Sequence, residues 1–302
     1  MDRLAEKLRQ GLLYFPVTPF SGHDVDADAL REQIRARLPR GPGAVFAACG
    51  TGEFSALGTR EYDTTVAAAV AEVDGAVPVL AGAGYSSALA VEFARRAADA
   101  GADGVLVFPP SGDRFEQEGL YRHYAAIAQA SPLPIILYQR GAASLTAATA
   151  ARLAELPQII GLKDGLGNLE NMARIRRSVG DRWSYFNGMP TAELSVAAFT
   201  AIGVPAYSSA AFAFLPEVAT RFFAATRAGD QAICEALIDQ FYAPFAEIRD
   251  RRAGYAVSLV KAGLRLRGFE TGTTQPPLTD PQPADLDDLA ELIESALRAV
   301  EA

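Results

Sequence analysis

Eight short apolar runs, each followed by a stretch with helical spacing, dominate the first two-thirds of the sequence and constrain its fold most strongly. The runs are nearly continuous rather than alternating, which is typical of parallel strands that are covered on both faces. They occupy residues 12–17, 44–49, 78–82, 104–108, 135–138, 159–163, 184–187 and 204–207. Clear helical patterns lie between them at residues 59–73, 87–100, 116–130 and 191–202.

Eight strand–helix units predict an α/β protein with a (β/α)₈ barrel. A doubly wound open sheet is the competing topology. The even spacing and the lack of a Gly-x-Gly-x-x-Gly phosphate-binding motif favour the barrel. Beyond about residue 210, helical patterns continue without strands, at residues 212–228, 231–249, 253–267 and 284–300. We therefore expect a barrel of residues 1–210 and a C-terminal helical extension of residues 211–302 packed on it.

Composition narrows the function. The net charge of −8 argues against nucleic acid as the main partner, because phosphate backbones attract basic surfaces. No apolar run has the roughly 18 to 20 residues of a membrane-spanning helix, and the N-terminus lacks a signal-peptide pattern, so we expect a cytoplasmic protein that does not bind membranes. Cys49 and Cys234 are too distant to suggest a disulfide framework, and His23 and His123 have no second ligand at metal-binding spacing. We expect neither a metal nor an organic cofactor.

Lys163 is the most informative polar residue, because it ends the sixth predicted strand and the active site of such a barrel lies at the carboxyl ends of the strands. The chain has three lysines among its 28 basic residues. Burial disfavours the charged form of a lysine, and the neutral amine is the nucleophile. The alternative is a structural ion pair with Asp164.

Two further strand ends carry chemistry. Tyr138 ends the fifth strand and could transfer protons beside Lys163, although taken alone a core tyrosine is the better interpretation. Arg140 follows and could face a carboxylate or the solvent. Gly50, Thr51 and Gly52 follow the second strand; their backbone N–H groups and the Thr51 hydroxyl could hold a carboxylate, or they could form an ordinary turn.

Together these residues resemble the dihydrodipicolinate synthase and N-acetylneuraminate lyase superfamily. That superfamily has Gly-Thr-Gly-Glu after strand two, a tyrosine after strand five and a Schiff-base lysine after strand six. The resemblance covers essentially the whole chain. Several blocks are more similar to the family of 5-dehydro-4-deoxyglucarate dehydratases, which decarboxylate and dehydrate their substrate to 2,5-dioxopentanoate. These blocks are residues 11–20, 50–54, 138–140, 161–167, 188–193, 204–210 and 251–258.

The resemblance implies a role for each site residue. Lys163 would form the Schiff base and Tyr138 would transfer protons. Thr51 and its neighbouring backbone would bind the carboxylate beside the ketone of a keto-sugar dicarboxylate. The distal end of the substrate would lie near Thr191, Ser208 and Ser209.

Two positions depart from the superfamily. Ser111 stands where many relatives have a tyrosine that is contributed across a dimer interface, and Gly50 stands where many have a second hydroxyl. A homo-oligomer, dimer or tetramer, remains the expectation. Cys49 is interpreted as a small packing residue.

Three rival functions remain open. A class I aldolase of the same superfamily would use Lys163 and Tyr138 to release pyruvate from a 2-keto-3-deoxy sugar acid. A non-catalytic barrel would bind a sugar acid without turnover. A cofactor-dependent barrel oxidoreductase is weakest, because the sequence has no flavin or nicotinamide signature. The base that removes a proton from C4 of the keto-sugar dicarboxylate could be Tyr138 or a water molecule.

Overall fold

All eight apolar runs form parallel strands that close into one barrel in the computed structural model, which describes residues 2–301. The predicted barrel is confirmed, and the open sheet is wrong because β1 pairs with both β4 and β10. The order around the barrel is β1-β10-β9-β8-β7-β6-β5-β4. The strands are β1 (Leu13–Tyr14), β4 (Ala44–Ala47), β5 (Val79–Ala83), β6 (Gly104–Val107), β7 (Ile135–Gln139), β8 (Ile159–Asp164), β9 (Ser184–Asn187) and β10 (Ala206–Ser209). A separate hairpin pairs β2 (Phe20–Ser21) with β3 (Asp24–Val25).

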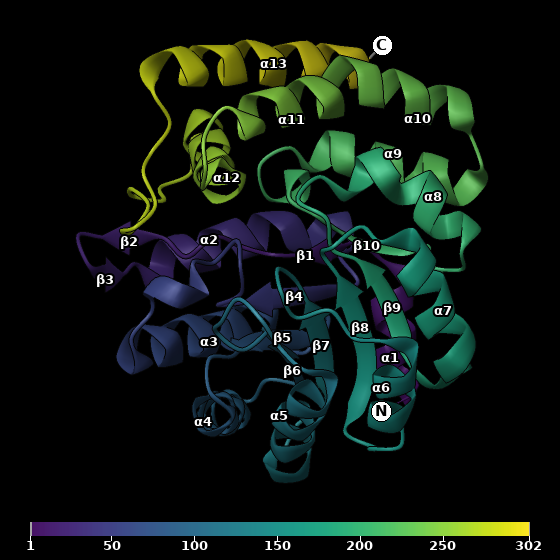
Figure 1. Ribbon diagram of the computed structural model, residues 1–302. Coiled ribbons are helices and arrows are strands. Elements are labelled where there is room, and N and C mark those ends of the chain that lie inside the picture. Colours follow the sequence, from purple (N-terminus) through teal and green to yellow (C-terminus); the bar gives the residue numbers. More distant parts are fainter. Residues whose placement is uncertain (1, 302) are drawn as a thin grey trace.

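Helices surround the barrel and cover one side of it (Figure 1). The first eight are α1 (Asp2–Gln10), α2 (Ala27–Arg37), α3 (Thr59–Val73), α4 (Ser87–Asp99), α5 (Gln117–Ala130), α6 (Ala147–Ala154), α7 (Leu169–Val179) and α8 (Val196–Ala201). The later ones are α9 (Pro216–Ala228), α10 (Gln231–Leu237), α11 (Ala243–Asp250), α12 (Tyr255–Leu266) and α13 (Pro283–Glu301). Side-chain N-caps fix several starts; the Ser86 hydroxyl, for example, accepts a hydrogen bond from the Leu89 N–H.

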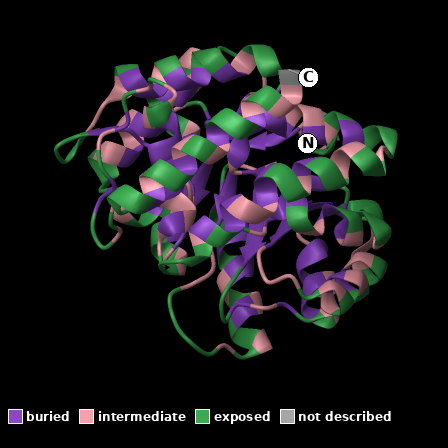
Figure 2. Cartoon of the chain, turned by 90° about the horizontal axis from the view of Figure 1, so that it is seen from above, coloured by how far each residue is buried: buried purple, intermediate pink, exposed green. Residues whose placement is uncertain are grey.

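Side chains of the strands alternate between the barrel interior and the helix layer, as the two-residue period of a strand requires. The interior is a small apolar cluster that includes Leu13, Phe46, Leu80, Leu106, Ile136, Tyr138, Ile160, Phe186 and Ala206. Residues of opposite parity, such as Ile135, Leu137 and Leu162, pack against the helices. Figure 2 shows the buried strands within helices whose outer faces are exposed. The barrel interior is therefore filled by side chains and leaves no channel through the strands.

Two predicted helices are divided in the structure. Residues 191–202 form a 3₁₀ turn (Ala192–Ser195) followed by the short α8. The predicted helix 231–249 contains a π-helical turn (Ile238–Tyr242), in which the Ala243 N–H donates to the Ile238 carbonyl. Pro244 follows directly and has no N–H for the regular hydrogen-bond ladder, which gives the turn a physical reason.

The C-terminal helices pack on one another, since α13 contacts α9, α11 and α12. One apolar cluster includes both barrel residues, such as Tyr14 and Val45, and C-terminal residues, such as Leu259 and Ile293. The division at residue 210 stays a prediction.

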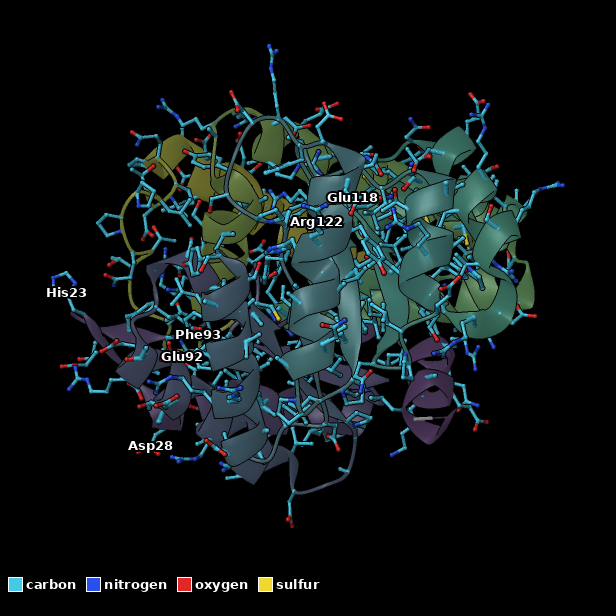
Figure 3. The ribbon with its side chains drawn as sticks, turned by 60° about the horizontal axis from the view of Figure 1, so that its bottom comes forward. His23, Asp28, Glu92, Phe93, Glu118 and Arg122 are labelled. Carbon is cyan, nitrogen blue, oxygen red and sulfur yellow. The ribbon has the colours of Figure 1, made fainter. Side chains whose placement is uncertain are left out.

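The outer helix faces carry charged pairs, such as Arg122 and Glu118 on α5, whose N···O distance is 3.0 Å (Figure 3). Within residues 2–301, no helix combines the length and the apolar character that crossing a membrane requires.

Candidate active site

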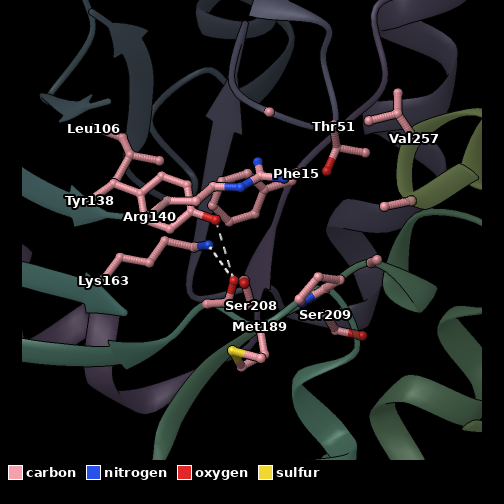
Figure 4. Close-up of a pocket in the computed structure, with 15 residues that line it drawn as sticks. Phe15, Thr51, Leu106, Tyr138, Arg140, Lys163, Met189, Ser208, Ser209 and Val257 are labelled. Atoms are coloured by element: carbon pink, nitrogen blue, oxygen red, sulfur yellow. Dashed lines mark hydrogen bonds between the residues drawn. The ribbon is translucent and has the colours of Figure 1, made fainter. Parts of the chain in front are cut away.

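Lys163 lies in the mouth of the barrel, one residue before the end of β8. It pairs in register with Tyr138 on β7 and with Phe186 on β9. Because Leu162 faces the helix layer, strand alternation turns Lys163 inward, and its side chain is 5% exposed. It forms part of the wall of a pocket that is also lined by Phe15, Gly50, Thr51, Leu106, Tyr138, Arg140, Gly188, Ser208 and Val257 (Figure 4).

The amine of Lys163 has no acidic partner. Its Nζ donates to the Gly188 carbonyl at 3.3 Å and lies 4.0 Å from the ring centroid of Tyr138. No carboxylate among the side chains of residues 4–300 forms a salt bridge with it. Asp164 is turned to the other side of the strand, where it accepts hydrogen bonds from Gln139 Nε2 at 2.6 Å and from the Gly167 N–H at 3.0 Å. The ion pair with Asp164 that the sequence allowed does not form.

Tyr138 shares the hydrogen-bond acceptor of Lys163. Its hydroxyl donates to the Gly188 carbonyl at 3.4 Å, and its ring packs edge-on against Phe108 at 5.7 Å. The phenol and the amine therefore meet at one backbone oxygen (Figure 4). A group that reacts with the amine would lie within reach of the phenol, which suits proton transfer.

Two glycines leave room for these side chains. A Cβ at Gly188 would stand 2.4 Å from Lys163 Nζ and 2.6 Å from its Cγ. A Cβ at Gly165 would stand 2.9 Å from the Tyr138 hydroxyl. Both glycines belong to sequence blocks that carry the family resemblance, but the sequence does not predict that they make room for Lys163 and Tyr138.

The glycine-rich turn after β4 reaches the same pocket only in part. Gly50 and Thr51 line the pocket, whereas Gly52 lies behind them, with its carbonyl accepting a hydrogen bond from the Thr18 hydroxyl at 2.7 Å. Cys49 is fully buried, and burial raises the pKa of its thiol, which agrees with a packing role.

The residues expected at the distal end of the substrate are divided. Ser208 lines the pocket, and Arg140 reaches over its mouth (Figure 4). Ser209 also lines the pocket, but its hydroxyl donates to Glu193 Oε1 at 2.5 Å, because Ser209 has the opposite strand parity to Ser208. Thr191 does not line the pocket and accepts a hydrogen bond from the Arg249 guanidinium. Ser111 is exposed and also lies outside the pocket.

Glu193, Ala256 and Val257 are among the contributors to the site that sequence reasoning missed. Glu193, which supports β10 from outside the barrel, is 1% exposed, and burial raises its pKa to about 7 although the Ser209 hydrogen bond opposes the shift. Ala256 and Val257, in the first turn of α12, line the pocket. The strand parity of Ser209 could have predicted that its hydroxyl turns away from that of Ser208, but nothing local to α12 indicates that this helix reaches the barrel mouth. Among the side chains described, those of residues 4–300, no group of three His, Cys, Asp or Glu is arranged to hold a metal.

The fold and this pocket define a class of (β/α)₈ proteins with a lysine amine at the barrel mouth. The family model described as "Dihydrodipicolinate synthetase family" matches residues 8–296. The chain therefore belongs to the dihydrodipicolinate synthetase family. The solved dihydrodipicolinate synthase of Oceanobacillus iheyensis has 25% sequence identity and a TM-score of 0.90, over 98% of this chain and 100% of that one.

Curated relatives are more similar in sequence. A "Probable 5-dehydro-4-deoxyglucarate dehydratase" of Streptomyces griseus is 51% identical, over 97% of this chain and 94% of its own length. Proteins of the same name from Azotobacter vinelandii and Rhizobium meliloti are 44% and 42% identical, with 97% or more of each chain covered. These matches confirm the resemblance that was predicted from the sequence blocks.

Gly188→Ala should displace Lys163 without unfolding the barrel, because the new methyl group would occupy the space of Nζ and Cγ. We expect covalent trapping of keto acids on Lys163 by borohydride, followed by mass spectrometry, to fall at least roughly tenfold, as for a misplaced nucleophile. Gly119→Ala is the matched control, since no atom lies within 4 Å of its Cβ position. Trapping at the parental level in Gly188→Ala would contradict this role of the glycine.

Glu193 should make the fold less stable as the pH rises. Its pKa is raised to about 7 in the folded state from the ordinary value of 4.5, so between these values the folded chain keeps a proton that the unfolded chain releases. The free energy of unfolding should therefore fall by about 3 kcal/mol from about pH 4.5 to pH 7 through this residue. Urea unfolding at about pH 5 and pH 8 should show a smaller decrease for Glu193→Gln than for the parent. Glu247→Gln, at an exposed position of α11, should show the same decrease in unfolding free energy as the parent. The parental decrease in Glu193→Gln would contradict the raised pKa of Glu193.

Proposed function

We propose that this chain is a hydro-lyase that decarboxylates and dehydrates 5-dehydro-4-deoxy-D-glucarate to 2,5-dioxopentanoate through a Schiff base on Lys163. The observation that carries this function is the amine of Lys163, which is buried in the pocket, lacks an acidic partner and shares the Gly188 carbonyl with Tyr138. The names of relatives that are 42–51% identical supply the substrate.

Condensation of Lys163 with the C5 ketone creates an iminium that accepts electrons. Loss of a C4 proton gives an enamine, and the enamine expels the C3 hydroxyl as water. The product of this step is an iminium conjugated to a C3–C4 double bond. The dehydration therefore needs a base near C4 and an acid for the leaving hydroxyl.

The conjugated iminium then accepts the electrons of the C1–C2 bond, and C1 leaves as carbon dioxide. Protonation at C4 restores the iminium and leaves an enol at C2, which becomes the aldehyde. Water then releases the product and the free amine. In total, substrate and one proton give 2,5-dioxopentanoate, carbon dioxide and water, so one lysine serves both bond cleavages.

The pocket offers groups for both ends of a dicarboxylate. The Gly50–Thr51 turn is the proposed site of the carboxylate beside the ketone, because its backbone and hydroxyl donors line the pocket. Arg140 and Ser208 are the proposed partners of the distal end. Ser209 lines the pocket beside Ser208, whereas Gly52 and Thr191 lie outside its lining and would act indirectly. Assembly into a dimer or tetramer remains part of the proposal.

The direct test is incubation of the pure chain with 5-dehydro-4-deoxy-D-glucarate without added metal. Carbon dioxide and an aldehyde should appear in equal amounts. Release of pyruvate would instead support an aldolase, and binding without turnover would support a non-catalytic binding protein.

Lys163→Ala should abolish turnover and leave the fold intact, because it removes the nucleophile. Borohydride reduction in the presence of substrate should give a stable adduct on Lys163 of the parent and none on the variant. Lys7→Ala, which removes another of the three lysines, should label as the parent does. Parental turnover without any adduct would rule out the Schiff base.

Tyr138→Phe should lower kcat roughly 10²- to 10⁴-fold while keeping the aromatic packing against Phe108, because it removes one proton-transfer group. Steady-state kinetics and the rate of adduct formation measure the effect. A kcat near that of the parent would remove Tyr138 from the proton relay.

A further inference from the structure

The turn that carries Gly50 and Thr51 lies between two strained residues. Ala48 and Glu53 have φ angles of 48° and 54°, in the left-handed region that disfavours residues with a Cβ. The other non-glycine residues with positive φ within residues 2–301 are Asp74 and Tyr85. Two of these four therefore flank the turn that lines the pocket. Such strain persists only where surrounding contacts hold it.

Those contacts converge on the side chain of Glu53. Glu53 Oε1 forms an ion pair with Lys261 Nζ at 2.6 Å, and these side chains are 1% and 0% exposed. Glu53 Oε2 accepts a hydrogen bond from the Gln275 N–H at 2.7 Å. Lys261 Nζ also donates to the Thr273 carbonyl at 3.0 Å and lies 4.4 Å from the centroid of the Phe20 ring.

The ion pair joins two walls of the pocket. Glu53 continues the Gly50–Thr51 turn, and Lys261 lies on α12, the helix whose first turn supplies Ala256 and Val257 to the pocket. Removing either partner would leave one buried charge alone beside the turn. The turn would then lose the contact that holds Glu53 in its strained conformation.

We propose that Glu53 and Lys261 are positioning residues that hold the Gly50–Thr51 turn in the shape that receives the carboxylate beside the substrate ketone. The inference rests on the proposed function. Stability alone does not explain the pair, because apolar residues of similar volume often replace a buried ion pair without loss of stability. A pair that serves only the fold would affect unfolding but not the affinity for a carboxylate.

Pyruvate is a suitable probe, because its polar groups are a ketone and the adjacent carboxylate, and trapping it requires no dehydration. The pyruvate concentration that gives half-maximal borohydride labelling of Lys163 should rise roughly tenfold or more in Glu53→Gln and in Lys261→Met, as expected for losing hydrogen bonds to a charged group. Labelling at saturating pyruvate should stay complete, because Lys163 itself is unchanged.

The double variant Glu53→Gln/Lys261→Met separates positioning from folding. It leaves no unpaired buried charge, so its urea midpoint should recover relative to the single variants, whereas its half-saturation concentration should stay raised. Arg265→Met is the matched control, because Arg265 lies on the same helix one turn away and pairs with Asp280 at 2.8 Å. It should keep the parental half-saturation concentration.

The possible outcomes distinguish the two proposals. A parental half-saturation concentration in the folded double variant, with full labelling, would overturn the positioning role alone. An equal rise in Arg265→Met would also overturn it, because the effect would then be general to α12. A parent chain that pyruvate and borohydride never label would overturn the proposed function together with this inference.

Discussion

Strand alternation in a closed barrel is the constraint on which the site depends. Each strand sends every second side chain into a narrow interior, so the side chains of two neighbouring residues at a strand end point in opposite directions. Tyr138 and Lys163, which are paired in register, both turn inward, whereas their neighbours Gln139 and Asp164 turn outward and bond to each other. The same rule admits Ser208 to the pocket and sends the Ser209 hydroxyl to Glu193. Strand alternation thus separates the amine of Lys163 from the adjacent carboxylate of Asp164.

The surroundings of Lys163 suit a nucleophile better than a structural cation. A structural lysine in a protein interior normally has a carboxylate partner, as Lys261 has in Glu53. Lys163 has a backbone carbonyl and two aromatic rings, those of Tyr138 and Phe15, at 4.0 and 5.4 Å. The two buried lysines Lys163 and Lys261 therefore have different kinds of partner. One is paired with a carboxylate, and the other contacts a backbone carbonyl and aromatic rings, as the proposed Schiff base would require.

The sequence predicted the parts of the structure that depend on local pattern. Apolar runs located all eight strands, and Lys163 and Tyr138 were predicted at the carboxyl ends of their strands, where each lies one residue before the last. The π-helical turn before Pro244 was missed because apolar spacing continues through it. Thr191 was expected near the substrate, but its partner is Arg249, 58 residues away, and such a tertiary contact leaves no local signal. Gly188 was noted only as part of the block 188–193, because its role depends on the path of the Lys163 side chain.

The C-terminal helices complete the site instead of merely covering the barrel. Ala256 and Val257 belong to the sequence block 251–258, which carries much of the resemblance to the dehydratases, and both line the pocket opened by the barrel strands. A chain with a net charge of −8 repels a dicarboxylate at long range, so local donors must attract it. Arg140 and Lys163 are the cationic side chains in the pocket lining, while α12 contributes apolar contact. Selectivity for a keto-sugar dicarboxylate would then depend on two walls that are far apart in sequence, and the buried contact between Glu53 and Lys261 joins them.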